Sequence, residues 1–227
     1  MSQKILILVI AYNEEPYIML ERECRRTWAS LQVQDVTTIF VHSSLRHNAC
    51  YQDNNTLYVP GEEGIFNVGY KMLNAFSYCL DNVDFDYIYR TNLSSYVYQP
   101  GLFSYVKSLG ENNVYKGAVG ICKGIRFASG CGYLISKNLV RYIVEHKSSW
   151  NHSLIDDVAL AQVLGGINVF PEPVKRIDIL NNADLVKFNV ETIGDCFHFR
   201  CKSDVDRTHD VRVMNMLHNY FHKQDLI

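Results

Sequence analysis

The chain has 227 residues, 48% hydrophobic and 12% aromatic, a composition that supports a packed core and excludes a disordered or fibrous protein. Its 22 Lys and Arg residues against 24 Asp and Glu give a net charge of −2, so we expect no nucleic-acid partner. Seven cysteines are an odd number, they form no Cys-x-x-Cys pair, and they are scattered through apolar stretches. We therefore expect reduced thiols and a reducing, cytoplasmic compartment.

The first predicted strand is the apolar run at residues 5–11, which is rich in β-branched side chains. Such a run is typical of a strand buried on both faces of a parallel sheet. It is too short to cross a membrane, and no other segment reaches about 18 apolar residues. We expect a soluble protein with no membrane span.

Strands and helices then alternate along the chain, which predicts an α/β fold with a mostly parallel central sheet flanked by helices. No linker interrupts the pattern, so we predict a single domain over residues 1–227. Further strands are predicted at residues 37–42, 56–59, 86–90, 114–119 and 174–179, with a glycine-punctuated segment at 127–135. Helices are predicted at residues 17–31, 64–80, 100–108, 138–145, 156–164 and 206–221.

Polar clusters follow three of these strands, at the sheet edge where α/β proteins bind their ligands. They are Tyr12-Asn13-Glu14, His42-Ser43-Ser44 and Thr91-Asn92-Leu93-Ser94-Ser95. Taken singly, each cluster also fits an ordinary turn or helix cap. Together they predict one binding site. No Gly-x-Gly-x-x-Gly or Walker loop follows a strand, which argues against dinucleotide cofactors and P-loop hydrolysis.

Five motifs follow one another along the chain. They are Glu21-Arg22-Glu23-Cys24-Arg25-Arg26-Thr27-Trp28, Lys71, Arg90-Thr91-Asn92-Leu93-Ser94, Ala128-Ser129-Gly130-Cys131-Gly132-Tyr133-Leu134-Ile135-Ser136 and Asp156-Asp157-Val158. In this order they resemble the motifs of the galactosyltransferase and fringe family of GT-A glycosyltransferases, over about residues 5–169. The segment His198-Phe199-Arg200-Cys201-Lys202 more closely resembles small glycosyltransferase domains of viral or microbial type.

The resemblance implies a GT-A, Rossmann-like fold, with a nucleotide-binding half at residues 1–98 and an acceptor-side half at 99–227 that carries the C-terminal helix. It implies transfer of a sugar from a nucleoside-diphosphate donor, with UDP favoured, to a carbohydrate or glycoprotein acceptor. Asp157 matches the base of an inverting transfer, and Asp156 is the second candidate. From the residues alone, both also fit charges that stabilise a helix N-terminus.

Asn92 and Ser94 stand where the family carries metal-binding acids, and neutral oxygens bind a dication weakly. Two interpretations follow. Either Mn²⁺ or Mg²⁺ binds weakly through the phosphates and His198, or Arg200, Lys202 and Arg207 replace the metal beside the N-terminus of the last helix. These three cations also fit ordinary solvated charges.

Further candidates surround this region. By resemblance, Tyr12 and Asn13 bind the nucleobase and Lys71 contacts the donor. Two interpretations stay open for Arg90: it contacts the phosphate or the sugar of the donor, or it pairs with an acid beneath the sheet. We expect the pair Glu62-Glu63 to cap the following helix rather than to contact the ribose. His146 and His152 flank Trp150 in a loop that suits an acceptor-side wall.

Two other functions stay open on the sequence alone. The missing acids would also fit a catalytically inactive domain that binds a nucleotide sugar or a glycan. A retaining transferase would need no base at Asp157.

Overall fold

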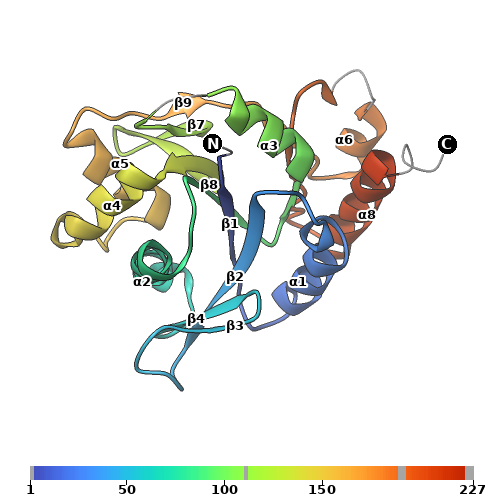
Figure 1. The fold of residues 1–227 in the computed structure, drawn as a ribbon. Coiled ribbons are helices and arrows are strands. Elements are labelled where there is room, and N and C mark those ends of the chain that lie inside the picture. The colour runs from blue at the N-terminus through green and yellow to red at the C-terminus, as the bar shows by residue number, and fades with distance from the viewer. Residues whose placement is uncertain (1–2, 110–111, 189–192, 223–227) are drawn as a thin grey trace.

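The computed structural model describes residues 3–109, 112–188 and 193–222. A large sheet runs through its centre, and helices lie on both faces of the sheet (Figure 1). A second, small sheet lies beside it. The strands are β1 (Ile5–Ile10), β2 (Val36–Ser44), β3 (Tyr51–Asp53), β4 (Thr56–Pro60), β5 (Tyr87–Asn92), β6 (Ser95–Val97), β7 (Tyr115–Cys122), β8 (Ile125–Ser136), β9 (Glu172–Pro173), β10 (Ile177–Asp178) and β11 (His198–Arg200).

Among the described residues, the central sheet has eight strands in the order β3-β4-β2-β1-β5-β8-β7-β9. Strand β1 lies between β2 and β5 and is parallel to both, and β2 is parallel to β4. Strand β8 is antiparallel to both β5 and β7. The predicted α/β class, with a mostly parallel sheet flanked by helices, is therefore confirmed.

Strand β1 is buried on both faces, as its unbroken apolar run predicts, and its side chains divide between two cores. The helices are α1 (Tyr17–Arg26), α2 (Val68–Asn82), α3 (Gln99–Lys107), α4 (Lys137–Glu145), α5 (Asp156–Gly165), α6 (Asn182–Lys187) and α8 (Thr208–His222). Ile5, Ile7 and Val9 pack with α1, α3 and α8, whereas Leu6 and Leu8 pack with α2, α4 and α5.

Two predicted helices were too long at one end. The helix predicted to reach residue 31 ends at Arg26, because Thr27 leaves the helical conformation, and a 3₁₀ turn, Trp28–Ser30, follows. The helix predicted from residue 64 begins at Val68. Gly64 has a φ of +133°, which no helix accommodates, and the 3₁₀ turn Ile65–Asn67 separates it from α2.

The strand predicted at residues 174–179 was also wrong. Within that range only Ile177–Asp178 is a strand, β10, and it pairs with β11 in the small sheet; β9, which pairs with β7 in the central sheet, lies just before the range at Glu172–Pro173. The glycine-punctuated segment at residues 127–135 belongs to the long strand β8. Strands β3, β6 and β11 were not predicted, since three residues are too few to show a period.

The small sheet has the order β10-β11-β6 and joins the C-terminal part of the chain to the middle. Strand β11 runs antiparallel to β6, pairing Arg200 with Ser95, and the Cys201 amide donates to the Ser94 carbonyl at 2.8 Å. This pairing positions the basic C-terminal segment next to the polar turn after β5. All seven cysteines are free thiols. None of the described helices is long and apolar enough to cross a membrane.

Candidate functional site

A cleft of about 600 Å³ opens at the carboxyl ends of β1 and β5. Its walls come from the end of β1, the start of α2, the turn after β5, the glycines of β8, the start of α5 and the residues at and after the end of β11. The structure therefore brings most of the sequence-predicted site residues together. Those that line the cleft are Tyr12, Lys71, Arg90, Asn92, Ser94, Asp156, Asp157, Arg200 and Lys202.

Two neighbouring carboxylates at the start of α5 face different partners. Asp156 Oδ2 accepts a hydrogen bond from Arg90 Nη2 at 2.8 Å, an ion pair with both side chains largely buried. Asp157 Oδ2 accepts from the Gly130 amide at 2.7 Å and Oδ1 from the Val158 amide at 2.9 Å. Burial, together with the charge of Asp156, raises the pKa of Asp157. Asp157 is thus a fixed carboxylate with an enhanced affinity for a proton.

The glycines of β8 make this arrangement possible. A Cβ on Gly130 would lie 2.4 Å from Arg90 Nη1 and 3.2 Å from Asp157 Oδ2. A Cβ on Gly132 would lie 2.3 Å from His198 Cε1 and 2.4 Å from the Tyr89 hydroxyl. The sequence predicted the segment Gly130-Cys131-Gly132 as a motif through its resemblance, but it did not reveal this steric reason for the two glycines.

Asn92 and Ser94, which the motif resemblance sets in the place of metal-binding acids, both take part in the structure of the turn after β5. Thr91 and Asn92, predicted in the turn, are the last residues of β5. Asn92 Oδ1 accepts from the Ser94 amide at 3.0 Å, closing an Asx turn. Ser94 Oγ accepts from Arg207 Nη2 at 2.6 Å, and Arg207 also pairs with Asp210 at 2.9 Å.

These contacts do not fit a divalent cation. The oxygens of Asn92 and Ser94 already accept hydrogen bonds, and one of their donors is itself a cation, Arg207. Arg200 and Lys202 line the same cleft. Within the described residues, no three His, Cys, Asp or Glu side chains are placed to share a metal ion. The chemistry of this wall suits an anion.

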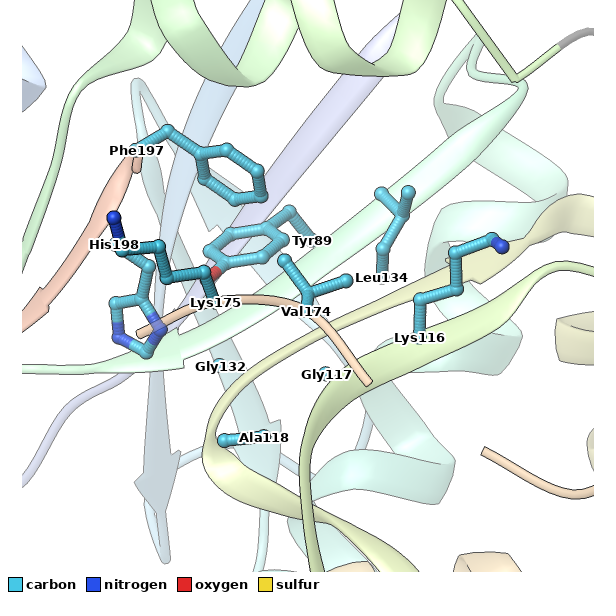
Figure 2. Close-up of a pocket in the computed structure, with 10 residues that line it drawn as sticks. All are labelled: Tyr89, Lys116, Gly117, Ala118, Gly132, Leu134, Val174, Lys175, Phe197 and His198. Atoms are coloured by element: carbon cyan, nitrogen blue, oxygen red, sulfur yellow. The ribbon is translucent and has the colours of Figure 1, made fainter. Parts of the chain in front are cut away.

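His198, the candidate metal ligand, lies outside the cleft. It lines a separate small cavity with Tyr89 and Gly132 (Figure 2), and its Nε2 lies 3.2 Å from Ser95 Oγ. Burial and the charges of Arg176 and Arg200 lower the pKa of His198 to about 3. The imidazole is therefore neutral near pH 7. Asn13, another candidate, is exposed and does not line the cleft.

Lys71 and Glu63 form an ion pair at the cleft wall. Lys71 Nζ also donates to the Ala11 carbonyl at 2.9 Å, and the Glu63 carboxylate accepts from the Ser43 amide at 2.7 Å. Burial lowers the pKa of Lys71. The pair thus joins α2 to the ends of β1 and β2. The prediction that Glu63 caps the following helix was wrong, because its carboxylate is used here.

Tyr12 lies edge-on to Tyr17, with ring centroids 5.4 Å apart. Both rings line the cleft, and the guanidinium of Arg207 lies 5.4 Å from the Tyr17 centroid. Sequence reasoning missed Tyr17 because it lies inside a predicted helix, where an aromatic residue is ordinarily part of the core.

The central sheet, the cleft beyond the ends of β1 and β5 and the antiparallel β8 define a GT-A-like fold. In a comparison of structures, the chain matches a glycosyltransferase involved in the glycosylation of the major capsid of PBCV-1, with a TM-score of 0.59 and 10% identity. The match covers 94% of this chain and 99% of the other.

A second structure, the 4-diphosphocytidyl-2C-methyl-D-erythritol synthase of Anaerococcus prevotii, matches at a TM-score of 0.47 and 12% identity, over 76% of this chain and 87% of the other. No protein-family model and no curated protein matches the sequence. Kinship with the galactosyltransferase and fringe family therefore stays a prediction from motifs.

Proposed function

We propose that this protein transfers a sugar, with inversion, from a nucleoside-diphosphate donor to a hydroxyl group of a carbohydrate or glycoprotein acceptor. UDP is the nucleotide favoured by the resemblance. The observation that carries the proposal is a single cleft with Asp157 on one wall and the basic side chains Arg200 and Lys202 on another. A proton acceptor and an anion site are the two elements that such a transfer requires.

The proposed reaction uses both walls in one step. Asp157 takes the proton of the acceptor hydroxyl as the oxygen attacks the anomeric carbon of the donor sugar. The bond from that carbon to the diphosphate oxygen breaks, and the electron pair leaves with the nucleoside diphosphate. Arg200, Lys202 and Arg207 offset the charge that develops on the diphosphate, the part that a metal ion plays in enzymes with an acidic motif.

The other candidates take supporting parts in this proposal. Tyr12, beside Tyr17, presents a ring on which a nucleobase can stack, and the exposed Asn13 follows it in the chain. Arg90 and Asp156 hold each other beside the reacting sugar, and Arg90 Nε has no partner among the described residues. Asn92 and Ser94 shape the turn under the diphosphate, and Lys71 fixes the wall behind it. Seven free thiols favour a reducing, cytoplasmic compartment.

Nucleotide binding without a metal is the first expected result. In calorimetry against UDP, GDP, CMP and dTDP, each with Mn²⁺, Mg²⁺ or EDTA, one diphosphate should bind, and its affinity should change less than threefold in EDTA. Slow hydrolysis of the matching nucleotide sugar should accompany binding. No binding of any of these nucleotides would contradict the proposal, and binding without turnover would favour an inactive binding domain.

Lys202→Ala tests the basic wall directly. Its side chain is 43% exposed and pairs at 3.7 Å with Asp204, so its loss leaves the fold intact. Losing one charge-assisted contact should weaken diphosphate binding about tenfold or more. Lys4→Ala is the matched control, because Lys4 is 47% exposed and pairs with Asp84. Equal effects of the two variants would place the diphosphate elsewhere.

The pH dependence of turnover should reveal the pKa of the proposed base, Asp157. An ordinary aspartate has a pKa of about 4, and burial raises the pKa of Asp157. As pH is lowered, kcat/KM should therefore begin to fall at a higher pH than an ordinary aspartate would give. Asp156→Asn removes a negative charge that raises this pKa, so its acid limb should move to lower pH. Profiles of kcat/KM from pH 4 to 9 measure both, and a limb unmoved in Asp156→Asn would argue against Asp157.

A further inference from the structure

Exposed apolar side chains gather in the 3₁₀ turn before α2, in the first turn of α2 and just before α5, beside the cleft. We call Ile65, Phe66, Tyr70, His152 and Ile155 the aromatic rim. Ile65 is 68% exposed, Phe66 83%, Tyr70 52% and Ile155 44%. So many large apolar side chains at one place on a surface mark a binding site more often than a chance grouping.

The rim has a rigid, flat part. The rings of Tyr70 and His152 stack with centroids 3.7 Å apart and planes 7° from parallel. Gly69 lets the loop come this close, because a Cβ there would lie 2.8 Å from Trp150 Nε1 and 3.5 Å from His152 Nδ1. Within the described chain, neither of these nitrogens has a hydrogen-bond partner. The Tyr70 ring is thus held against His152 on one face, while the residue stays 52% exposed.

The rim is continuous with the wall that carries the candidate base. Ile65 and Ile155 both line the cleft, and Ile155 directly precedes Asp156 and Asp157. Whatever occupies the rim therefore extends toward a carboxylate suited to take a proton from a hydroxyl group. No member of the rim is an acidic or a strongly basic side chain, which favours an uncharged occupant.

We propose that the aromatic rim binds a neutral pyranose ring of the acceptor, with the apolar C–H face of the sugar against Tyr70 and Phe66. This inference rests on the proposed function and assigns its acceptor side. Aromatic side chains suit a sugar because one face of the ring is apolar while the hydroxyl groups at its edge stay solvated. The rim would thereby direct one of those hydroxyls toward Asp157.

Binding of simple glycosides tests the rim without any donor. Methyl glycosides of glucose, galactose, mannose, fucose and xylose are examined by saturation-transfer difference NMR against the full chain. At least one should receive saturation, and its dissociation constant should rise at least fivefold in Tyr70→Ala and in Phe66→Ala. The matched control is Tyr51→Ala, since Tyr51 is 49% exposed on β3 and does not line the cleft.

The outcomes separate this inference from the proposed function. Nucleotide affinity, measured on the same samples, should be unchanged in both rim variants. If nucleotides bind but no glycoside does, or if Tyr51→Ala weakens glycoside binding as much as Tyr70→Ala, the inference is overturned and the proposed function stands. A dimer in light scattering that Phe66→Ala dissociates would also overturn it, because the rim would then be covered by a second copy.

Discussion

Asp157→Asn should abolish sugar transfer, with kcat reduced by about 10² to 10⁴, the contribution of a positioned general base. The amide cannot take the acceptor proton, but its oxygen can still accept the Gly130 amide hydrogen, while the hydrogen bond from the Val158 amide is lost. Nucleotide binding should therefore be retained. The measurements are kcat with the donor identified by calorimetry and the dissociation constant of its nucleoside diphosphate.

Stability should not fall with activity in this variant. Burial raises the pKa of Asp157 in the folded state above its value in the unfolded state. The protonated carboxyl group therefore stabilises the fold at low pH, and this contribution to stability is lost as pH rises through the folded-state pKa. An uncharged Asn removes that loss, so at pH 7 the Tm should be within a few degrees of the parent. Turnover within tenfold of the parent would show that Asp157 is not the base.

Gly130→Ala should destabilise the protein and inactivate it together. The added methyl group would lie 2.4 Å from Arg90 Nη1 and 3.1 Å from Arg90 Cζ, so the guanidinium of this residue, which is only 5% exposed, must move away from its position beside Asp156. Separating Arg90 from Asp156 leaves buried charges without partners, at a cost of about 3 kcal/mol. For a chain of this size, that lowers Tm by roughly 10 °C. Thermal unfolding followed by circular dichroism measures the change.

Gly165→Ala is the control for this substitution. Gly165 also lies in a regular element, the last turn of α5, but its added Cβ would meet nothing closer than 3.9 Å. Its Tm should stay within about 2 °C of the parent, since the free energy of unfolding should change by less than about 1 kcal/mol. Equal losses in the two variants would mean that any methyl group is harmful and that the Arg90 contact is not the cause.

The parts of the fold that sequence predicted are those with a long, regular pattern. The apolar run of β1 is unbroken, so both its conformation and its burial on two faces followed directly. The ends of α1 and α2 were missed because single residues decide them, Thr27 at one and Gly64 at the other. Strand β11 was missed because it depends on pairing with β6, a distant partner that no local pattern reveals.

In the candidate site, too, the sequence predicted some features and not others. The general rule that ligands bind at strand ends identified Tyr12, Asn92 and Ser94, which line the cleft. It also selected the cluster His42-Ser43-Ser44 after the second strand, which does not line the cleft, so that part of the prediction was wrong.

The roles of Asn92 and Ser94 could not be predicted, because Asn92 closes a turn and Ser94 accepts from Arg207, which comes from the far end of the chain. His198 was misjudged as a cleft residue since sequence shows a residue type but not the side of the sheet it faces.

The pairing of β6 with β11 also has a consequence for how the protein forms during synthesis. The large sheet can assemble while the ribosome is still translating, but β6 must wait for the C-terminal segment before its edge is covered. Contacts so distant in sequence slow folding and leave an open strand edge that can aggregate. Nascent chains that stop before β11 should therefore depend on chaperones, and the anion-binding wall should be among the last parts of the molecule to form.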